Sequence, residues 1–241
     1  MNIRNITAIA IALSLFAPVG TANAAERTPD DILRDYEKAS GGTNPWKKRK
    51  AVRIRQVVSL RGMNLQGAGE TIQTKGGAFL VVQELPVVGK LTKASNGKVI
   101  WSQDKINGLR ILEGNEADQA RLESMWQADL RLRTVYPTRK IAPSETTAEE
   151  CVELATKGSP PIVRCFDKQT HLATTMKGTA VSPQGETPYL VKFLDYALQD
   201  GIMLSRRQEV SAGPAMLDIR LEGIEWDPKL NPSIFKLPKV K

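Results

Sequence analysis

The sequence predicts an α+β protein built on one large, curved antiparallel sheet of about 11 strands, with helices against its concave face. Short segments of strand type follow one another with tight turns between them, a pattern typical of an antiparallel meander. One segment of helix type precedes the strands, and a second divides them into two groups of about six. A sheet of this size normally curls, which creates a concave face that helices can cover.

The N-terminal residues 1–24 are predicted to be a secretory signal peptide. Arg4 provides a basic start, residues 6–17 are almost entirely apolar, and the sequence ANA at 22–24 is a small-residue cleavage site. The apolar run is shorter than the roughly 20 residues that span a bilayer, and the alternative is an N-terminal anchor helix. We therefore expect cleavage after Ala24 and a soluble, exported, single domain of residues 25–241, which in a bacterium works in the periplasm.

The segment 28–42 predicts the first helix. Thr28 is suited to cap it, Pro29 fits its first turn, and the two aspartates that follow favour the positive end of the helix dipole. Two glycines at 41 and 42 end it. One apolar stripe along this helix contains Ile32, Leu33, Tyr36 and Ala39.

The remaining elements follow from periodicity and turn signals. Asn96-Gly97 predicts a two-residue hairpin turn in which both residues have positive φ. A second helix is predicted at 115–133, capped by Asn115, and an irregular surface segment at 227–239. The strands are predicted at 51–62, 67–75, 77–85, 91–95, 98–103, 109–114, 150–156, 161–167, 172–178, 189–196, 202–210 and 215–226.

Cys151 and Cys165 are the only two cysteines of the chain. In an oxidising compartment such a pair is typical of a disulfide, and the turn residues between them predict a stapled hairpin. Closing a loop of this size stabilises the fold by about 3 kcal/mol in the chain-entropy model. A metal site is disfavoured because the chain has one histidine and no further cysteine.

The chain carries 34 Lys and Arg residues against 26 Asp and Glu, a net charge of +8. A basic surface attracts nucleic acid, anionic lipid or acidic protein. Because an exported protein rarely meets nucleic acid, we expect transient contact with an anionic membrane surface or an envelope partner protein instead. The alternative is a solvated basic face, since much of this charge is scattered along the strands.

The sequence gives little sign of catalysis. His171, the only histidine, lies in a predicted turn, and the linear signatures of triad hydrolases, zinc proteases, P-loops and dinucleotide sites do not occur. We therefore expect no enzyme, no catalytic residue, no cofactor and no metal. A hydrolase built on carboxylates alone remains an alternative, because such a site has no linear signature.

Apolar side chains are the more informative candidates. A large curled sheet has more inner surface than a few small helices fill, which favours an apolar ligand cavity, while core packing is the alternative for each residue. The candidate cavity and lid residues are Phe79, Val81, Leu85, Trp101, Ile111, Leu122, Met125, Trp126 and Phe193.

The order of several short sequences resembles the outer-membrane lipoprotein-sorting protein family, with its LolA/LolB-type fold. The similar sequences are YEKASGG (36–42), the tryptophan and basic KKRKAVRIR that follow it (46–55), NGKVIWSQ (96–103), and LNPSIFKLP (230–238). The resemblance implies an unclosed β-barrel of about 11 strands whose helices form a lid over an apolar cavity for acyl chains. It also implies an arginine that holds the lid closed, for which Arg53, Arg55 and Arg61 are the candidates.

The leading hypothesis is a periplasmic carrier or binder of lipidated protein or another acyl-chain ligand, in outer-membrane lipoprotein sorting or lipid trafficking. Its ligand partners are then lipoprotein acyl chains or another lipid. The second hypothesis is an envelope interaction or scaffold protein whose cavity is filled by its own side chains. The presence or absence of a void inside the sheet separates the two.

Overall fold

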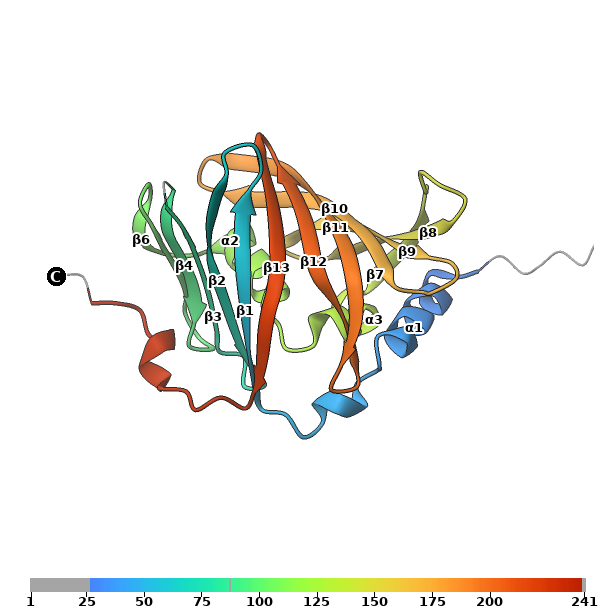
Figure 1. The fold of residues 1–241 in the computed structure, drawn as a ribbon, viewed down its shortest axis with the longest axis horizontal. Helices are drawn as coiled ribbons and strands as arrows, with labels where there is room; N and C mark the ends of the chain where they lie inside the picture. Colours follow the sequence, from blue (N-terminus) through green and yellow to red (C-terminus); the bar gives the residue numbers. More distant parts are fainter. Residues whose placement is uncertain (1–26, 87, 240–241) are drawn as a thin grey trace, which may run out of the picture.

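All the strands join one antiparallel sheet of 13 strands in the computed structural model, which describes residues 27–86 and 88–239 (Figure 1). The predicted signal peptide lies outside the described residues. None of the described helices is long and apolar enough to cross a membrane. The α+β class with a large curved antiparallel sheet is confirmed, with two strands more than the expected number.

The element bounds are as follows. The helical elements are α1 (Pro29–Ala39), η1 (Asn44–Trp46), α2 (Gly114–Glu123), η2 (Ala128–Leu130), α3 (Leu132–Val135) and η3 (Pro232–Phe235). The strands are β1 (Ala51–Leu60), β2 (Leu65–Thr74), β3 (Phe79–Leu85), β4 (Gly89–Ser95), β5 (Ile100–Asp104), β6 (Gly108–Ile111), β7 (Thr138–Ala142), β8 (Glu149–Thr156), β9 (Ser159–Asp167), β10 (Ala173–Ser182), β11 (Gly185–Gln199), β12 (Ile202–Ala212) and β13 (Ala215–Trp226).

The sheet consists of two meanders that meet at one strand pair. One meander contains β1 to β6 and the other contains β7 to β13, each with its strands in sequence order across the sheet. The two meanders are joined where β1 pairs with β13. The edge strands are therefore β6 and β7, and the chain passes between them through residues 114–135, called here the covering segment. Figure 1 shows α2 on the side of the sheet away from the viewer. We call that side the inner face and the opposite side the outer face.

The first helix forms as the sequence predicts, although it ends earlier. Thr28 and Asp31 make a capping box, and Ile32, Leu33 and Tyr36 are buried. The helix stops at Ala39 because the chain there meets the β11–β12 turn. A Cβ on Gly41 would lie 2.1 Å from the carbonyl oxygen of Gly201, so only glycine fits at this approach.

The second helix is not continuous over 115–133. The helix α2 starts at Gly114, so Asn115 is not its cap, and it ends at Glu123. At Gln127 the backbone has a φ of 60°, and short turns η2 and α3 follow. The break has a tertiary cause, because it lets Trp126 contact Trp46 while Leu132 joins a different cluster.

Two smaller expectations are also corrected. Four residues separate the paired Ser95 and Ile100, so 96–97 is not a two-residue turn. Gly97 has a positive φ. The side-chain oxygen of Asn96 accepts hydrogen bonds from the backbone amides of Lys98 and Val99 at 2.9 and 3.0 Å. Strand β7 was not predicted because only Ala142 of its five residues is buried, which leaves no apolar alternation to detect.

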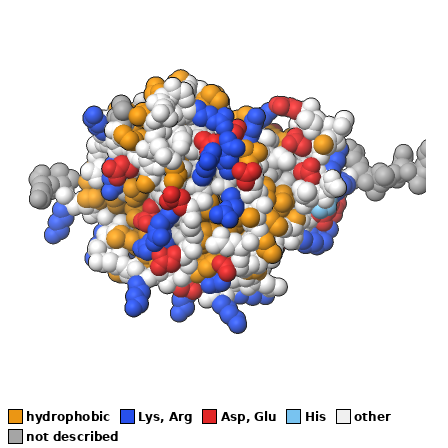
Figure 2. Space-filling model, viewed as in Figure 1, with side chains coloured by type: hydrophobic (Ala, Val, Ile, Leu, Met, Phe, Trp, Pro, Cys, Tyr) orange, Lys and Arg blue, Asp and Glu red, His pale blue; other side chains and the backbone are white. Residues whose placement is uncertain are grey.

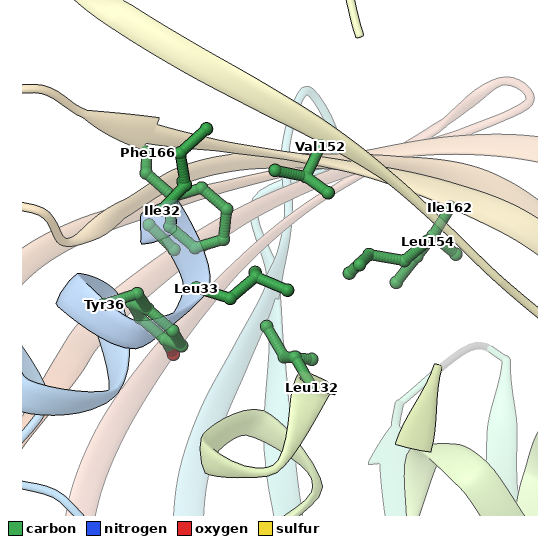
Figure 3. Close-up of a cluster of buried hydrophobic side chains, with 9 residues drawn as sticks. Ile32, Leu33, Tyr36, Leu132, Val152, Leu154, Ile162 and Phe166 are labelled. Carbon is green, nitrogen blue, oxygen red and sulfur yellow. The ribbon is translucent and has the colours of Figure 1, made fainter. Parts of the chain in front are cut away.

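The inner face is filled at one end by a cluster from α1, α3, β8 and β9 (Figure 3). Phe166 is fully buried there, and its ring centroid lies 5.0 Å from that of Tyr36. Phe193 and Met176 pack against the edge of this cluster. A second inner cluster in the middle of the sheet contains Trp46, Val52, Trp126, Leu130 and Ile202.

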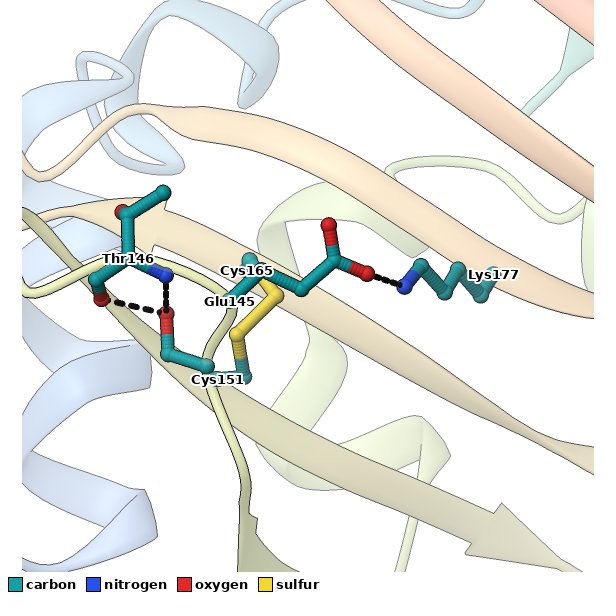
Figure 4. Close-up of a disulfide and its surroundings, with 6 residues drawn as sticks. Glu145, Thr146, Cys151, Cys165 and Lys177 are labelled. Atoms are coloured by element: carbon teal, nitrogen blue, oxygen red, sulfur yellow. Dashed lines mark hydrogen bonds and ion pairs between the residues drawn. A yellow bond between two sulfur atoms is a disulfide. The ribbon is translucent and has the colours of Figure 1, made fainter.

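The predicted disulfide between Cys151 and Cys165 is confirmed (Figure 4). The two residues are direct partners on β8 and β9, and they pack with Ala142 on the outer face. Close by, Lys177 pairs with Glu145 and holds the pKa of that carboxyl below its usual value. The bond therefore ties two strands near the β7 edge of the sheet.

Replacing both cysteines by alanine is expected to lower the free energy of unfolding by about 3 kcal/mol, the chain-entropy value for a loop of this length. Urea denaturation followed by circular dichroism measures this loss, and a reducing agent added to the unmodified protein should reproduce it. A midpoint that neither change moves would contradict the stabilising role of the bond.

Candidate functional site

A cavity of about 660 Å³ opens on the inner face, at the end of the sheet that carries the β2–β3 and β4–β5 turns. Its walls come from the sheet, from η1 and from the covering segment. The lining residues are Thr43, Trp46, Lys47, Lys75, Gly77, Phe79, Ser95, Gly97, Lys98, Ile100, Arg121, Ser124, Met125, Trp126, Gln127 and Arg131.

The base of the cavity is apolar and buried. Phe79 and Ile100 are 3% and 4% exposed, and they pack against Ala117 and Ala120 of α2. On the other side, the rings of Trp46 and Trp126 meet edge to face with centroids 5.1 Å apart. The buried indole Nε1 of Trp46 has no hydrogen-bond acceptor among the described residues.

The rim of the cavity is basic. Lys47, Lys75, Lys98, Arg121 and Arg131 all line it and are all exposed, and no carboxylate belongs to the lining. Within the described part of the chain only Arg121 of these five has an ion-pair partner, Asp118 at 2.6 Å. The site thus combines a buried apolar base with a rim of five exposed cations, four of them without an ion-pair partner among the described residues.

Three of the nine predicted site residues line this cavity: Phe79, Met125 and Trp126. Val81 packs against the Phe79 cluster without lining the cavity, and Leu85 and Leu122 are partly buried outside it. Phe193 belongs to the filled end of the inner face, and Ile111 is 52% exposed.

Trp101 does not lie on the concave face, where the sequence placed it. Side chains alternate along a strand, and its neighbour Ile100 points to the inner face, so Trp101 points to the outer face. There it packs with Ile72, Leu80 and Ala94 under η3. Its Nε1 donates a hydrogen bond to the backbone oxygen of Phe235 at 3.2 Å, so the C-terminal segment is packed rather than loosely placed.

Sequence reasoning missed Trp46, Ile100 and the basic rim. The WKKRK run at 46–50 was noted only as part of a resemblance, although an aromatic residue followed by a dense basic stretch is itself a signal of an amphipathic site. The sequence around Lys75 and Lys98 does not mark them as site residues, because each lies in an ordinary turn. The two turns come together at the rim of the cavity only in the folded sheet.

A buried arginine connects the covering segment to the sheet. Arg164 on β9 is 2% exposed, and its Nη1 donates to Oδ1 of Asp129 in η2 at 2.6 Å. Its Nη2 donates to the hydroxyl of Tyr36 at 3.2 Å, and its guanidinium lies 5.1 and 5.0 Å from the ring centroids of Tyr36 and Phe193. Burial opposes the charge, but Tyr36 and Asp129 outweigh it and the pKa of Arg164 stays above its usual value.

The three arginines proposed from resemblance have a different role. Arg53 and Arg55 lie on the outer face and pair with Glu225 at 2.8 and 3.3 Å. Arg61 pairs with Glu209 and with Asp218. None of them lines the cavity or is ion-paired to the covering segment. Arg164 binds η2, while Arg110 pairs with Glu116 of α2 and Arg139 donates to the backbone oxygen of Arg133.

The two ends of the covering segment are attached differently. The α2 end is fixed by Gln119, whose amide donates to the oxygen of Thr179 at 2.8 Å and accepts from the amide of Val181 at 2.9 Å. The η2 end is held through Asp129, whose side chain is 73% exposed. Residues 124–131 therefore make one side-chain ion pair to the sheet, and they also pack on it through Trp126 and Leu130 of the second inner cluster.

Two solved structures share this architecture at low sequence identity. A LolA superfamily protein from Nitrosomonas europaea is 9% identical, with a TM-score of 0.56 over 88% of this chain and 98% of that one. A DUF1329 family protein from Desulfovibrio piger is 13% identical, with a TM-score of 0.53 over 86% and 95%. No family model and no curated protein matches the sequence. The chain therefore has a LolA-like fold, as the resemblance implied.

The change Asp129→Asn is expected to loosen residues 124–135 while the rest of the fold stays intact. One charge-assisted hydrogen bond is weakened, and because Asp129 is largely solvated its loss should cost only about 1 kcal/mol. Hydrogen exchange of the backbone amides in 124–135 should then quicken roughly fivefold. The matched control is Glu225→Gln, which removes an ion-pair partner on the outer face. If both variants changed hydrogen exchange in 124–135 equally, the Arg164–Asp129 bond would not be what holds this segment.

Proposed function

We propose that this protein is a non-enzymatic carrier or binder of an acyl-chain ligand, which it holds in the cavity under the covering segment. The observation that carries the proposal is the buried apolar base of a 660 Å³ cavity inside a LolA-like fold. This volume falls within the roughly 300–1,000 Å³ that is usual for small-molecule sites.

The energetics of burial support this function. Each methylene group that leaves water contributes about 0.8 kcal/mol, so even part of an acyl chain resting on Phe79, Ile100 and Trp126 is held firmly. A carrier must also release its ligand. Residues 124–131, held by the Arg164–Asp129 pair and by the packing of Trp126 and Leu130, are the element that opens in this proposal.

Two alternatives are less well supported. A scaffold with an interior filled by its own side chains should contain no void, whereas this inner face contains a cavity of about 660 Å³ beside its packed clusters. A hydrolase would need a general base beside its substrate, and the lining of the cavity supplies neither a carboxylate nor an imidazole.

The apolar N-terminal residues and the LolA-like fold support a proposal for the place of action. We propose export through the signal peptide of residues 1–24 and work in the periplasm, with a lipoprotein or another lipid as the carried species. Contact with an anionic membrane surface or an envelope partner is part of the same proposal, because loading and release require a donor and an acceptor.

Native mass spectrometry of the protein purified from its own cell envelope tests this function. We expect a bound hydrophobic species that organic extraction removes, and rebinding of a 16-carbon fatty acid by the stripped protein. Met125→Trp should fill the cavity and weaken that rebinding at least about tenfold, since the space for several methylenes is lost.

The matched control is Met63→Trp, the same change at a residue that is 66% exposed in the β1–β2 turn. It should bind like the unmodified protein. A protein that arrives empty and takes up no fatty acid or lipopeptide would reject the carrier function and favour the scaffold.

A further inference from the structure

Several arginines of the outer face are ion-paired, whereas four of the five cations that line the cavity are not. Figure 2 looks onto the outer face, where acidic and basic side chains lie intermixed. Arginines of that face, such as Arg53, Arg207 and Arg220, each have a carboxylate within 4 Å. In the described residues, Lys47, Lys75, Lys98 and Arg131 have no such partner, although all four line one cavity.

These cations converge from separate parts of the chain. Lys47 follows η1, Lys75 lies in the β2–β3 turn and Lys98 in the β4–β5 turn. Arg121 and Arg131 belong to the covering segment, so the positive charge surrounds the opening from both the sheet and the covering segment. Like charges brought together without a counter-charge repel one another, which makes an anion at this opening favourable.

We infer that the occupant is an amphiphile with an oxyanion headgroup, a carboxylate or a phosphate, whose acyl chain rests on the apolar base and whose headgroup lies among the rim cations. This inference rests on the proposed function and adds the charge of the ligand to it. A neutral headgroup leaves the rim charges uncompensated, and a cationic one adds to their repulsion. An anion there also bridges Arg131 of the covering segment to the lysines of the sheet, which favours the closed position of the segment.

Binding measured by tryptophan fluorescence tests the inference, because Trp46 and Trp126 both line the cavity. The probes are hexadecanoate, hexadecyl phosphate, neutral 1-hexadecanoylglycerol and hexadecyltrimethylammonium, each below its aggregation concentration, with inorganic phosphate alone as a fifth. Both anionic amphiphiles should bind about tenfold more tightly than the neutral one, the cationic one should bind most weakly, and phosphate alone should give no response.

A charge-matched pair of variants separates the rim from the overall charge. Lys75→Gln with Lys98→Gln should weaken hexadecanoate binding about tenfold and leave the glycerol ester within about twofold. Lys90→Gln with Lys157→Gln removes the same charge at exposed lysines outside the lining and should change neither at 0.15 M salt, where the Debye length is about 8 Å.

The possible outcomes distinguish the preference for an anionic headgroup from the proposed function of carrying an acyl chain. Equal affinities for the anionic and neutral probes, or an unchanged hexadecanoate affinity in the Lys75–Lys98 variant, would overturn the headgroup preference while leaving an acyl-chain carrier. A response to inorganic phosphate as strong as to hexadecyl phosphate would overturn the requirement for a chain. Failure of all four amphiphiles to bind would reject the proposed function itself.

Discussion

The pairing of β1 with β13 is the constraint on which the rest of the structure depends. It joins the first and last strands over a register that runs from Val52–Trp226 to Leu60–Leu217. Each meander alone is a smaller sheet with two open edges, and only the joined sheet is large enough to curl and enclose an inner face. At the end of this strand pair, the Asp227 carboxylate accepts hydrogen bonds from the backbone amides of Lys50 and Ala51 at 2.6 and 3.0 Å. These bonds hold the pKa of Asp227 below its usual value.

Once the sheet curls, its inner face divides into a filled and a hollow part. Aromatic side chains of α1 and β9 occupy the β8–β9 end, where Tyr36 and Phe166 are buried. Arg164 lies at the border, with its charge satisfied by Asp129 and by aromatic faces, so the same residue completes the packed end and holds the covering segment. The cavity survives because α2 presents only the small Ala117 and Ala120 to Phe79 and Ile100, and because the segment breaks at Gln127 before it can fill the remaining space.

Much of the fold could be predicted because its signals are local. The cap at Thr28 and the proline that follows start α1, and period-two alternation marks long strands such as β1 and β13. The disulfide was predicted from the two cysteines and from the expected export of the chain. The errors fall where local signals are weak or contradicted: β7 lacks apolar alternation, and the expected helix at 115–133 has a continuous periodicity that tertiary contacts of Trp126 interrupt.

The candidate site was predicted less completely, for one physical reason. Alternation places Ile100 and Trp101 on opposite faces of β5, but it does not say which face is covered by helices and which by the C-terminal segment. Similarly, Arg164 lies on the same face of β9 as the apolar Ile162 and Phe166. Only the folded chain brings Asp129 to it as a partner. The sequence by itself determined twelve of the thirteen strands, the first helix, the disulfide and the LolA-like fold. The tertiary structure decided which side chains face the void and which cations surround it, because both depend on the curvature that unites segments far apart in the chain.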